Sequence, residues 1–578
     1  MKWQVMTLMA ALSSSSSFGF FIDGDGHYGM KGETRTSPGF SRDSGTFQAL
    51  QQTFRLRGEA RLNDRSSAFL EFRLFPDERS AYLGDEAKPR KCQHRYDSSE
   101  RERASDDTDC EGRHQDTAEP RYKDYTPQIR KAYLQYAFEN CLVKAGRRGR
   151  DWGLGIFLDS GEDPFEYDAS VFDGINCDIN IQKSQTLGFS IGFDKLTESG
   201  TYIVDPRDSK SSGDENVVGT RSRGFGSNDG SDDIDQFYFT IEYDDRIANA
   251  GAGMTKQVGV YFSQISSKDI PNDEDEVAAG KGGSNTDLKF MDLYTGFYFG
   301  SFAIRNEFLF RMGKSADPNW SRLGGNYGTY NAPETNKLQS IGFAGNIEWT
   351  LSQSGSFMGP KKYNKGTASR HLLKLEYAYA PGDKDGYYDL PESGVIPTAA
   401  ERSKYPYLTN PDGSDPGRDN KVEAIAFHAN FKPALIFFNG RPEQDHMRRD
   451  GVFDPERVVN ASVFALAYGF ESLEGGNFEV KLITGYLNNG PPSEVKDFYE
   501  NKAKTGDNGE DADSGNRPAG FHGLDLGYEL DLQYKYLVGN EVEVGLASAY
   551  ARPGDAWKTT KSDPADNMLI QSSITFKF

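Results

Sequence analysis

Two short motifs in this sequence match the spelling of catalytic or cofactor-binding sites. Residues 188–192 read GFSIG, the GxSxG pattern of a serine-hydrolase turn, and residues 24–29 read GDGHYG, the GxGxxG pattern of a dinucleotide-binding loop. Both sites need a helix directly after the motif, and the residues that follow predict none. We therefore expect Ser190 and the glycine run to lie on strands, and we predict a protein that is not an enzyme and has no cofactor.

Metal ligands are poorly represented in the sequence. The seven histidines include no pair spaced four residues apart, so the HExxH zinc motif is absent. The acidic runs at 273–276 and 507–513 could bind Ca²⁺ through several carboxylates, but we favour a solvated loop whose charges repel one another. We predict no resident metal.

Charged residues that alternate with apolar ones are more informative. Residues 54–62 place Phe, Leu, Gly, Ala and Leu on one side and charged residues on the other, which predicts a strand with one lipid-facing and one lumen-facing side. The residues predicted to line a lumen are Arg55, Arg57, Arg61, Arg73, Lys131, Lys144, Arg147, Arg148, Arg150, Glu59, Glu71, Asp525, Glu529, Asp531, Glu541 and Glu543.

Two interpretations of these charges remain open. A basic wall opposite an acidic wall would create a transverse field that orients polar solutes. Alternatively, the charges pair across strands and brace the wall. The dense cluster Arg147, Arg148 and Arg150 would favour anionic or hydroxylated solutes, which accept forked hydrogen bonds from guanidinium groups.

Four cysteines, Cys92, Cys110, Cys141 and Cys177, indicate an oxidising compartment. They allow three pairings. We favour Cys92–Cys110, within one long polar loop, and Cys141–Cys177, on successive predicted strands. The alternative, a zinc site, lacks a CxxC motif.

The elements that must position these residues repeat along the chain. Alternating segments of about ten residues are joined in turn by short and by long polar connections, which is typical of an outer-membrane barrel. We predict an all-β fold, a single closed antiparallel transmembrane β-barrel of about 18–20 strands with long extracellular loops and short periplasmic turns. Near residue 430 this pattern predicts two strands, 423–431 and 434–439, joined by a turn at Lys432-Pro433.

Composition agrees with this architecture. The chain has 578 residues, a formal net charge of −21 and 13% aromatic residues, and its mean hydropathy is −0.69. The acidity argues against a nucleic-acid-binding protein. A barrel explains the low hydropathy, because only one side of each strand is apolar.

The two ends of the chain carry targeting patterns. Residues 1–19 resemble a secretory signal peptide, with Lys2 before an apolar run and small residues at 17 and 19, which leaves 20–578 as the barrel domain. The last segment alternates and ends in Phe578, as in substrates of the barrel-assembly machinery. We predict a monomer in the outer membrane of a Gram-negative cell, with periplasmic termini and with outer-membrane lipid and lipopolysaccharide as partners.

Residues 130–158 (RKAYLQYAFENCLVKAGRRGRDWGLGIFL) and 524–555 (LDLGYELDLQYKYLVGNEVEVGLASAYARPGD) resemble the alginate-export family of outer-membrane porins. The resemblance implies a single-chain barrel of about eighteen strands that passes a solute through an electropositive lumen. This chain departs from the family in its acidic long loops and in its loop cysteines.

The sequence therefore predicts a porin for passive passage of hydrophilic solutes, with anionic or carbohydrate solutes as candidates. The alternative is a surface barrel that acts as an adhesin, receptor or envelope scaffold through long acidic loops such as 77–126 and 382–420.

Overall fold

Twenty strands form one sheet in the computed structural model of the chain. The structure describes residues 21–37, 46–74, 81–84, 128–166, 169–180, 186–195, 234–246, 253–267, 286–315, 336–354, 369–382, 421–422, 425, 427–428, 430–438, 458–472, 475–489, 524–539, 541–557 and 564–578. The strands are β1 (Phe21–Thr36), β2 (Thr46–Asn63), β3 (Ser66–Leu74), β4 (Ala81–Gly84), β5 (Gln128–Ala137), β6 (Cys141–Gly149), β7 (Val171–Asn180), β8 (Leu187–Lys195), β9 (Ile234–Asp244), β10 (Thr255–Ser267), β11 (Thr286–Phe299), β12 (Phe302–Ser315), β13 (Asn336–Ser354), β14 (Ser369–Ala380), β15 (Lys421–Val422), β16 (Ala461–Glu471), β17 (Gly476–Leu487), β18 (Asp525–Val538), β19 (Val542–Pro553) and β20 (Asn567–Lys577). A short 3-10 helix, η9 (Asp555–Trp557), follows β19.

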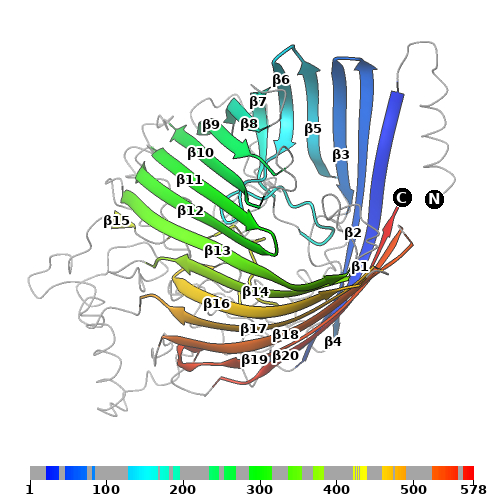
Figure 1. Ribbon diagram of the computed structural model, residues 1–578, viewed down its shortest axis with the longest axis vertical. Helices are drawn as coiled ribbons and strands as arrows, with labels where there is room; N and C mark the ends of the chain where they lie inside the picture. The colour runs from blue at the N-terminus through cyan, green and yellow to red at the C-terminus, as the bar shows by residue number, and fades with distance from the viewer. Residues whose placement is uncertain are drawn as a thin grey trace, which may run out of the picture.

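The sheet closes into an antiparallel barrel. Strand β1 pairs with β2 on one side and with β20 on the other, and every other long strand pairs with its neighbours in the chain. The short strands β4 and β15 are additions, on β2 and β13, so the twenty strands reduce to eighteen that go round the barrel. Figure 1 shows the curved sheet passing from blue β1 to red β20. The predicted closed all-β barrel is confirmed, with the lower of the predicted strand numbers.

Alternation along the strands separates two faces. On β16, Val463 and Ala465 are at most 3% exposed, whereas Phe464 and Leu466 are each 49% exposed. Large apolar side chains are exposed in the same way on strands all round the barrel. An apolar outer face on a closed barrel is the surface that lipid requires. No helix among the described residues is long and apolar enough to cross a membrane.

Tight turns join the strands at one rim. Between β2 and β3, the side chain of Asn63 accepts hydrogen bonds at 2.9 Å from the main-chain N–H groups of Arg65 and Ser66. This is the local bonding that favours Asn in turns. Between β11 and β12, Gly300 adopts φ +57°, a conformation that glycine reaches without steric cost.

One predicted hairpin is wrong. The segment expected to form two strands around Lys432-Pro433 does not join the barrel, because β14 pairs directly with β16. The described residues of this segment between 425 and 438 are not strands and are mostly buried, with Phe427, Phe437 and Phe438 each 1% exposed. Their apolar side chains pack inside the barrel, so they are buried although the segment pairs with no strand.

The other sequence motifs fall where they were expected. Residues 188–192 lie on β8, where the Ser190 hydroxyl donates to Asp178 at 2.7 Å, and residues 24–29 lie on β1. Cys141 and Cys177 form the predicted disulfide between β6 and β7, with their Cα atoms 5.7 Å apart. Cys92, Cys110, the expected signal peptide and both acidic runs lie outside the described residues.

Candidate functional site: a constriction inside the barrel

The connection between β6 and β7 folds into the barrel interior instead of leaving its rim. We call residues 150–166 of this connection the first inward segment; Figure 1 shows it as a thin cyan trace inside the curved sheet. Three glycines in it have positive φ, Gly153 (+58°), Gly155 (+84°) and Gly161 (+62°), which lets the chain turn repeatedly in a small space. Asp151 closes the fold by accepting hydrogen bonds from the Ser160 N–H at 2.6 Å and hydroxyl at 2.8 Å.

A basic cluster on β2, β3 and β5 holds one end of this segment through its main chain. Arg55 donates to the carbonyls of Gly161 at 2.7 Å and Glu162 at 3.0 Å, and Arg73 donates to the carbonyl of Glu166 at 2.6 Å. Arg130 donates to the carbonyl of Ser160. Hydrogen bonds from buried guanidinium groups are among the stronger ones in proteins, so this end is fixed to the wall.

Carboxylates neutralise the same cluster. Glu71 accepts a hydrogen bond from Arg57 at 2.9 Å, and Glu162 of the inward segment pairs with both Arg57 and Lys131. Burial alone would raise the pKa of Glu162, but the adjacent cations Lys131 and Arg57 outweigh it and lower the pKa to about 2. These ion pairs favour the bracing interpretation over a separate basic wall.

A second glutamate in this segment has the opposite environment. Burial, reinforced by the carboxylates of Asp163 and Asp159, raises the pKa of Glu166 to about 7. The Asp163 N–H donates to its carboxyl at 2.9 Å. The segment thus carries one carboxylate that stays ionised and one that titrates near neutral pH.

The opposite wall, β11 and β12, holds the other end of the first inward segment. The Trp152 indole N–H donates to Asp292 at 3.0 Å, and the Leu154 N–H donates to Glu307. The ring of Phe157 stacks on Phe290 with centroids 4.9 Å apart. The segment therefore crosses the lumen from β2 and β3 to β11 and β12.

Residues 425–438, which we call the second inward segment, are held by β18. Glu529 accepts from the main-chain N–H groups of Ile436 at 2.6 Å and Phe437 at 2.7 Å, and Asp531 accepts from that of Leu435 at 3.2 Å. The Phe437 ring stacks on Trp557 of η9 with centroids 6.0 Å apart. The main-chain N–H groups of this segment have no sheet partner, and these buried carboxylates accept their hydrogen bonds instead.

The two inward segments meet inside the barrel. The His428 N–H donates to the carbonyl of Ile156 at 2.8 Å, and the Asn430 amide donates to Asp159 at 3.1 Å. Ile156 is fully buried at this contact. Together the segments form a continuous bridge from β2 to β18, which we call the constriction.

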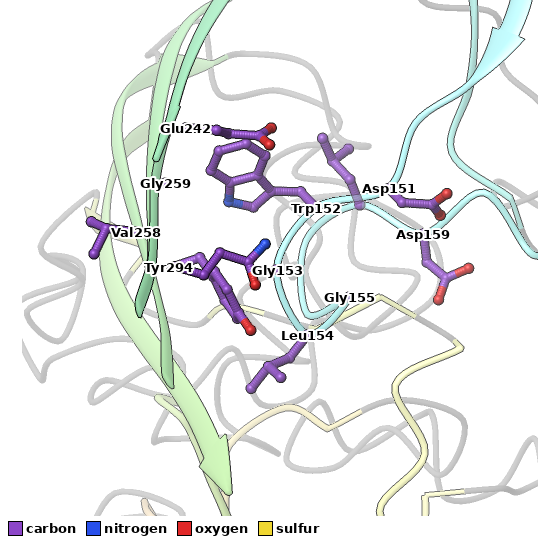
Figure 2. A pocket seen from close by; sticks show the side chains of 12 residues that line it. Asp151, Trp152, Gly153, Leu154, Gly155, Asp159, Glu242, Val258, Gly259 and Tyr294 are labelled. Atoms are coloured by element: carbon purple, nitrogen blue, oxygen red, sulfur yellow. The ribbon is translucent and has the colours of Figure 1, made fainter. Parts of the chain in front are cut away.

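A polar cavity of about 310 Å³ lies between the first inward segment and the wall of β9, β10 and β11. Figure 2 shows the Glu242 carboxylate beside the Trp152 indole, with Tyr294 below them and with Asp151 and Asp159 on the far side of the segment. The cavity is lined by Asp151, Trp152, Gly153, Leu154, Gly155, Leu158, Asp159, Glu242, Gln257, Val258, Gly259 and Tyr294. Its lining contains three carboxylates and no Lys or Arg.

Several predicted lumen residues belong to the anchors of the constriction. These are Arg55, Arg57, Arg73, Lys131, Glu71, Glu529 and Asp531, together with Arg150, which belongs to the first inward segment and donates to Asp194 and Tyr261.

Other predicted residues lie on the barrel wall and pair with other residues of the wall strands. They form the pairs Arg148–Asp194 (2.6 Å), Lys144–Asp178 (2.9 Å), Arg61–Glu59 (4.0 Å) and Glu543–Lys577 (2.9 Å). Asp525 and Glu541 are exposed near opposite ends of β18 and β19.

Arg147 differs from the prediction. It pairs with Asp173 at 2.8 Å and donates to the carbonyl of Ile129, whose side chain is 47% exposed on the outer face. Since Arg148 points inward to Asp194, its neighbour along the strand points outward. Phe578 pairs its main chain with Gly26 of β1, and its part in assembly stays a prediction.

Sequence reasoning missed the residues that make the constriction itself. Trp152, Glu162, Asp292 and Glu307 were not predicted as site residues, and the second inward segment was assigned to strands. The one sequence signal was the density of glycine and acidic residues in 153–166, within the 21 residues that separate β6 from β7.

No family model matches the chain, and no curated protein matches it. Among solved structures it is similar to the outer membrane protein OprD from Pseudomonas aeruginosa, at 9% identity and a TM-score of 0.41, covering 96% of this chain and 93% of that one. It is also similar to OpdK from Pseudomonas aeruginosa (10% identity, TM-score 0.41, covering 96% and 99%). A BenF-like porin from Pseudomonas fluorescens Pf-5 gives 9% identity and a TM-score of 0.43, covering 96% and 98%.

Proposed function

We propose that this protein is an outer-membrane channel through which small hydrophilic solutes pass passively, at a rate limited by the constriction. One arrangement carries the proposal. A closed barrel with an apolar outer face carries charged and polar side chains on its inner wall, and two segments anchored to opposite walls meet inside it. Anchored inward segments narrow a lumen and set what can pass, whereas a barrel acting only through its outer loops has no need of them.

Of the candidate solutes, we propose that hydroxylated, uncharged molecules pass in preference to anionic ones. The lining of the cavity beside the constriction supplies the Glu242 carboxylate, the Gln257 amide and the rings of Trp152 and Tyr294. Carboxylate and amide groups hydrogen-bond to hydroxyls, and aromatic faces pack against the C–H faces of sugar rings. Three carboxylates without a basic residue in the lining would repel an anion.

Planar-bilayer recording and liposome swelling test these two statements. Purified protein should give discrete conductance steps, and liposomes containing it should swell faster in a neutral sugar than in a sugar acid of similar size. The absence of conductance steps in any salt would refute the channel. Faster swelling in the sugar acid would refute the solute preference and leave the channel standing.

The outer membrane of a Gram-negative cell is the proposed location, with the short turns on the periplasmic side, because closed barrels of this kind occur there. The resemblance to the alginate-export family, the monomeric state and delivery by the barrel-assembly machinery stay predictions. Block of the sugar pathway by alginate oligosaccharides would support the family resemblance.

A further inference from the structure

Three lysines lie close together on the outer face of the barrel, near the rim of the long connections. They are Lys289 on β11, Lys314 on β12 and Lys337 on β13, and we call them the lysine row. We propose that the lysine row binds the phosphate group of a phosphorylated lipid in the outer leaflet of the membrane.

The neighbours of these lysines along the strands show that they point outward. On β12, Arg311 is 2% exposed and faces the lumen, whereas Met312 is 49% exposed and shares its face with Lys314. On β13, Leu338 is 1% exposed, and Lys337 beside it is exposed on the other face. β12 ends and β13 begins within two residues of these lysines, so the row lies at the edge of the apolar outer surface.

The register brings like charges together. Lys314 and Lys337 are direct partners across β12 and β13, which puts their Cα atoms about 5 Å apart. Lys289 pairs with Met312 and is thus a diagonal neighbour of Lys314. Like charges at directly opposed positions destabilise a sheet unless a counter-charge compensates them.

The described part of the chain supplies too little counter-charge. Asp287 is the partner of Lys314 on its other side, and its carboxylate accepts a hydrogen bond from Gln264 at 3.1 Å. None of the three lysines forms an ion pair with another described residue. By contrast, Arg147, on the outer face nearer β7, is paired with Asp173 at 2.8 Å. Among the described residues, the row therefore carries a net positive charge, which a bound anion would compensate.

The surroundings favour a lipid over a free anion. Directly toward the membrane centre, the same face presents Met291 and Ile341, which are 38% and 52% exposed. Acyl chains would lie against these side chains, while the lysine stems extend along the apolar surface and carry their ammonium groups to the phosphate level. A molecule with both acyl chains and a phosphate satisfies both parts of the surface.

This inference rests on the proposed outer-membrane location. The test is native mass spectrometry of the purified full-length protein, titrated with bis-phosphorylated lipid A and with the same lipid after removal of its phosphates. The Lys314→Gln/Lys337→Gln variant should bind the phosphorylated lipid about tenfold more weakly or worse, because two charge-assisted hydrogen bonds are lost. Lys314→Arg/Lys337→Arg should retain binding, since both charges remain.

Lys256→Gln is the matched control. Lys256 is an exposed lysine on β10, at the rim of the short turns and so at the other rim of the barrel from the lysine row. Its ammonium group lies 5.2 Å from the Tyr243 ring centroid. The Lys256→Gln variant should bind the phosphorylated lipid as the wild type does. Unchanged binding by the Lys314→Gln/Lys337→Gln variant would overturn the inference, as would equal binding of the phosphorylated and the dephosphorylated lipid by the wild type.

Conductance separates this site from the channel itself. The lysine variants should give the same conductance steps as the wild type, because the row faces away from the lumen. Unchanged lipid binding with normal steps refutes the lipid site alone. If the lipid binding is as predicted but neither the wild type nor the variants give conductance steps, the channel is refuted and the lipid site stands.

Discussion

Gly153 shows how one residue ties the first inward segment to the barrel wall. Its φ of +58° lies in the left-handed region, and an added Cβ would overlap the carboxylate of Glu307, which accepts the Leu154 N–H. The close approach of main chain and carboxylate therefore depends on the absence of a side chain. The sequence shows the glycine but gives no hint of its partner on β12, 154 positions along the chain.

Gly153→Ala should loosen the constriction and raise the single-channel conductance. Gly300→Ala is the matched control, because Gly300 has φ +57° in a turn where an added Cβ meets no atom within 4 Å. Both variants carry left-handed strain of about 1 kcal/mol, and only Gly153→Ala adds the clash. An equal conductance change in both variants would show that the contact with Glu307 does not hold the segment.

The two glutamates of the first inward segment respond to pH in opposite senses. The pKa of Glu162 is lowered to about 2, so its ion pairs contribute stability above its ordinary pKa of 4.5 and lose it only as the pH falls toward 2. The pKa of Glu166 is raised to about 7, so its burial becomes less favourable as the pH rises from 4.5 to about 7.

From about pH 5 to about pH 8, the open-channel current noise should therefore increase as Glu166 ionises beside Asp163 and Asp159 and loosens the segment. Glu166→Gln should remove this step and keep the low-noise behaviour at both pH values. Glu162→Gln should raise the noise at both values, because it removes a carboxylate that is ionised throughout this range. A pH step of the same size in Glu166→Gln would contradict the assignment.

At the scale of elements, the two inward segments are held in the same way on different walls, by N–H groups that donate hydrogen bonds to buried carboxylates. Asp292 and Glu307 accept N–H groups of the first segment, and Glu529 and Asp531 accept those of the second. These carboxylates alternate with apolar residues, so the sequence placed Glu529 and Asp531 in the lumen. Their actual partners are main-chain groups about 93 positions away, which no local pattern contains.

Glu529→Ala should release the second inward segment from β18 and raise the conductance. The change leaves the N–H groups of Ile436 and Phe437 without their acceptor, at a cost of about 1–3 kcal/mol each while they stay buried. Glu479→Ala is the control, since Glu479 lies on the neighbouring strand β17 and pairs with Lys374 at 3.0 Å. Single-channel recording should show an increase for Glu529→Ala alone, and a similar increase for both would contradict the anchoring role.

The disulfide joins neighbouring strands and belongs to the wall. Cys141→Ser/Cys177→Ser should lower the free energy of unfolding by about 2–4 kcal/mol, because it frees a loop with a sequence separation of 36 in the unfolded chain. Thermal unfolding should shift to lower temperature while the conductance stays unchanged. A changed conductance at normal stability would mean that the disulfide shapes the lumen.

The strands and the inward segments differ in how well sequence predicts them. Alternation over ten residues is a local signal, so the strand at 54–62 in β2 was predicted together with its outward face. The second inward segment carries the same apolar pattern, yet its apolar side chains pack inside the barrel. A period-two pattern indicates that the side chains on one side of a segment are apolar. It does not show whether the segment is a strand of the barrel or packs inside the barrel.

At the scale of the whole molecule, closure turns separate strands into a channel. β1 and β20 are remote in sequence and become neighbours, with His27 opposite Lys577. Of the two interpretations left open for the lumen charges, the ion pairs around Arg55 favour bracing of the wall over a separate basic wall. Charges of both signs collect around Arg55, where Glu71 and Glu162 neutralise them, because an inward segment brings its own carboxylate to the wall.

The central claim is that two inward segments limit flow through an open barrel, and a deletion tests it most directly. Residues 154–159 can be removed by joining Gly153 to Ser160, since the Asp151 side chain accepts the Ser160 N–H at 2.6 Å and the chain on the two sides of the deletion therefore lies close together. We predict conductance steps for the wild type and steps several-fold larger for the deletion variant in planar bilayers. Equal steps in the two proteins, or none in either, would contradict the account.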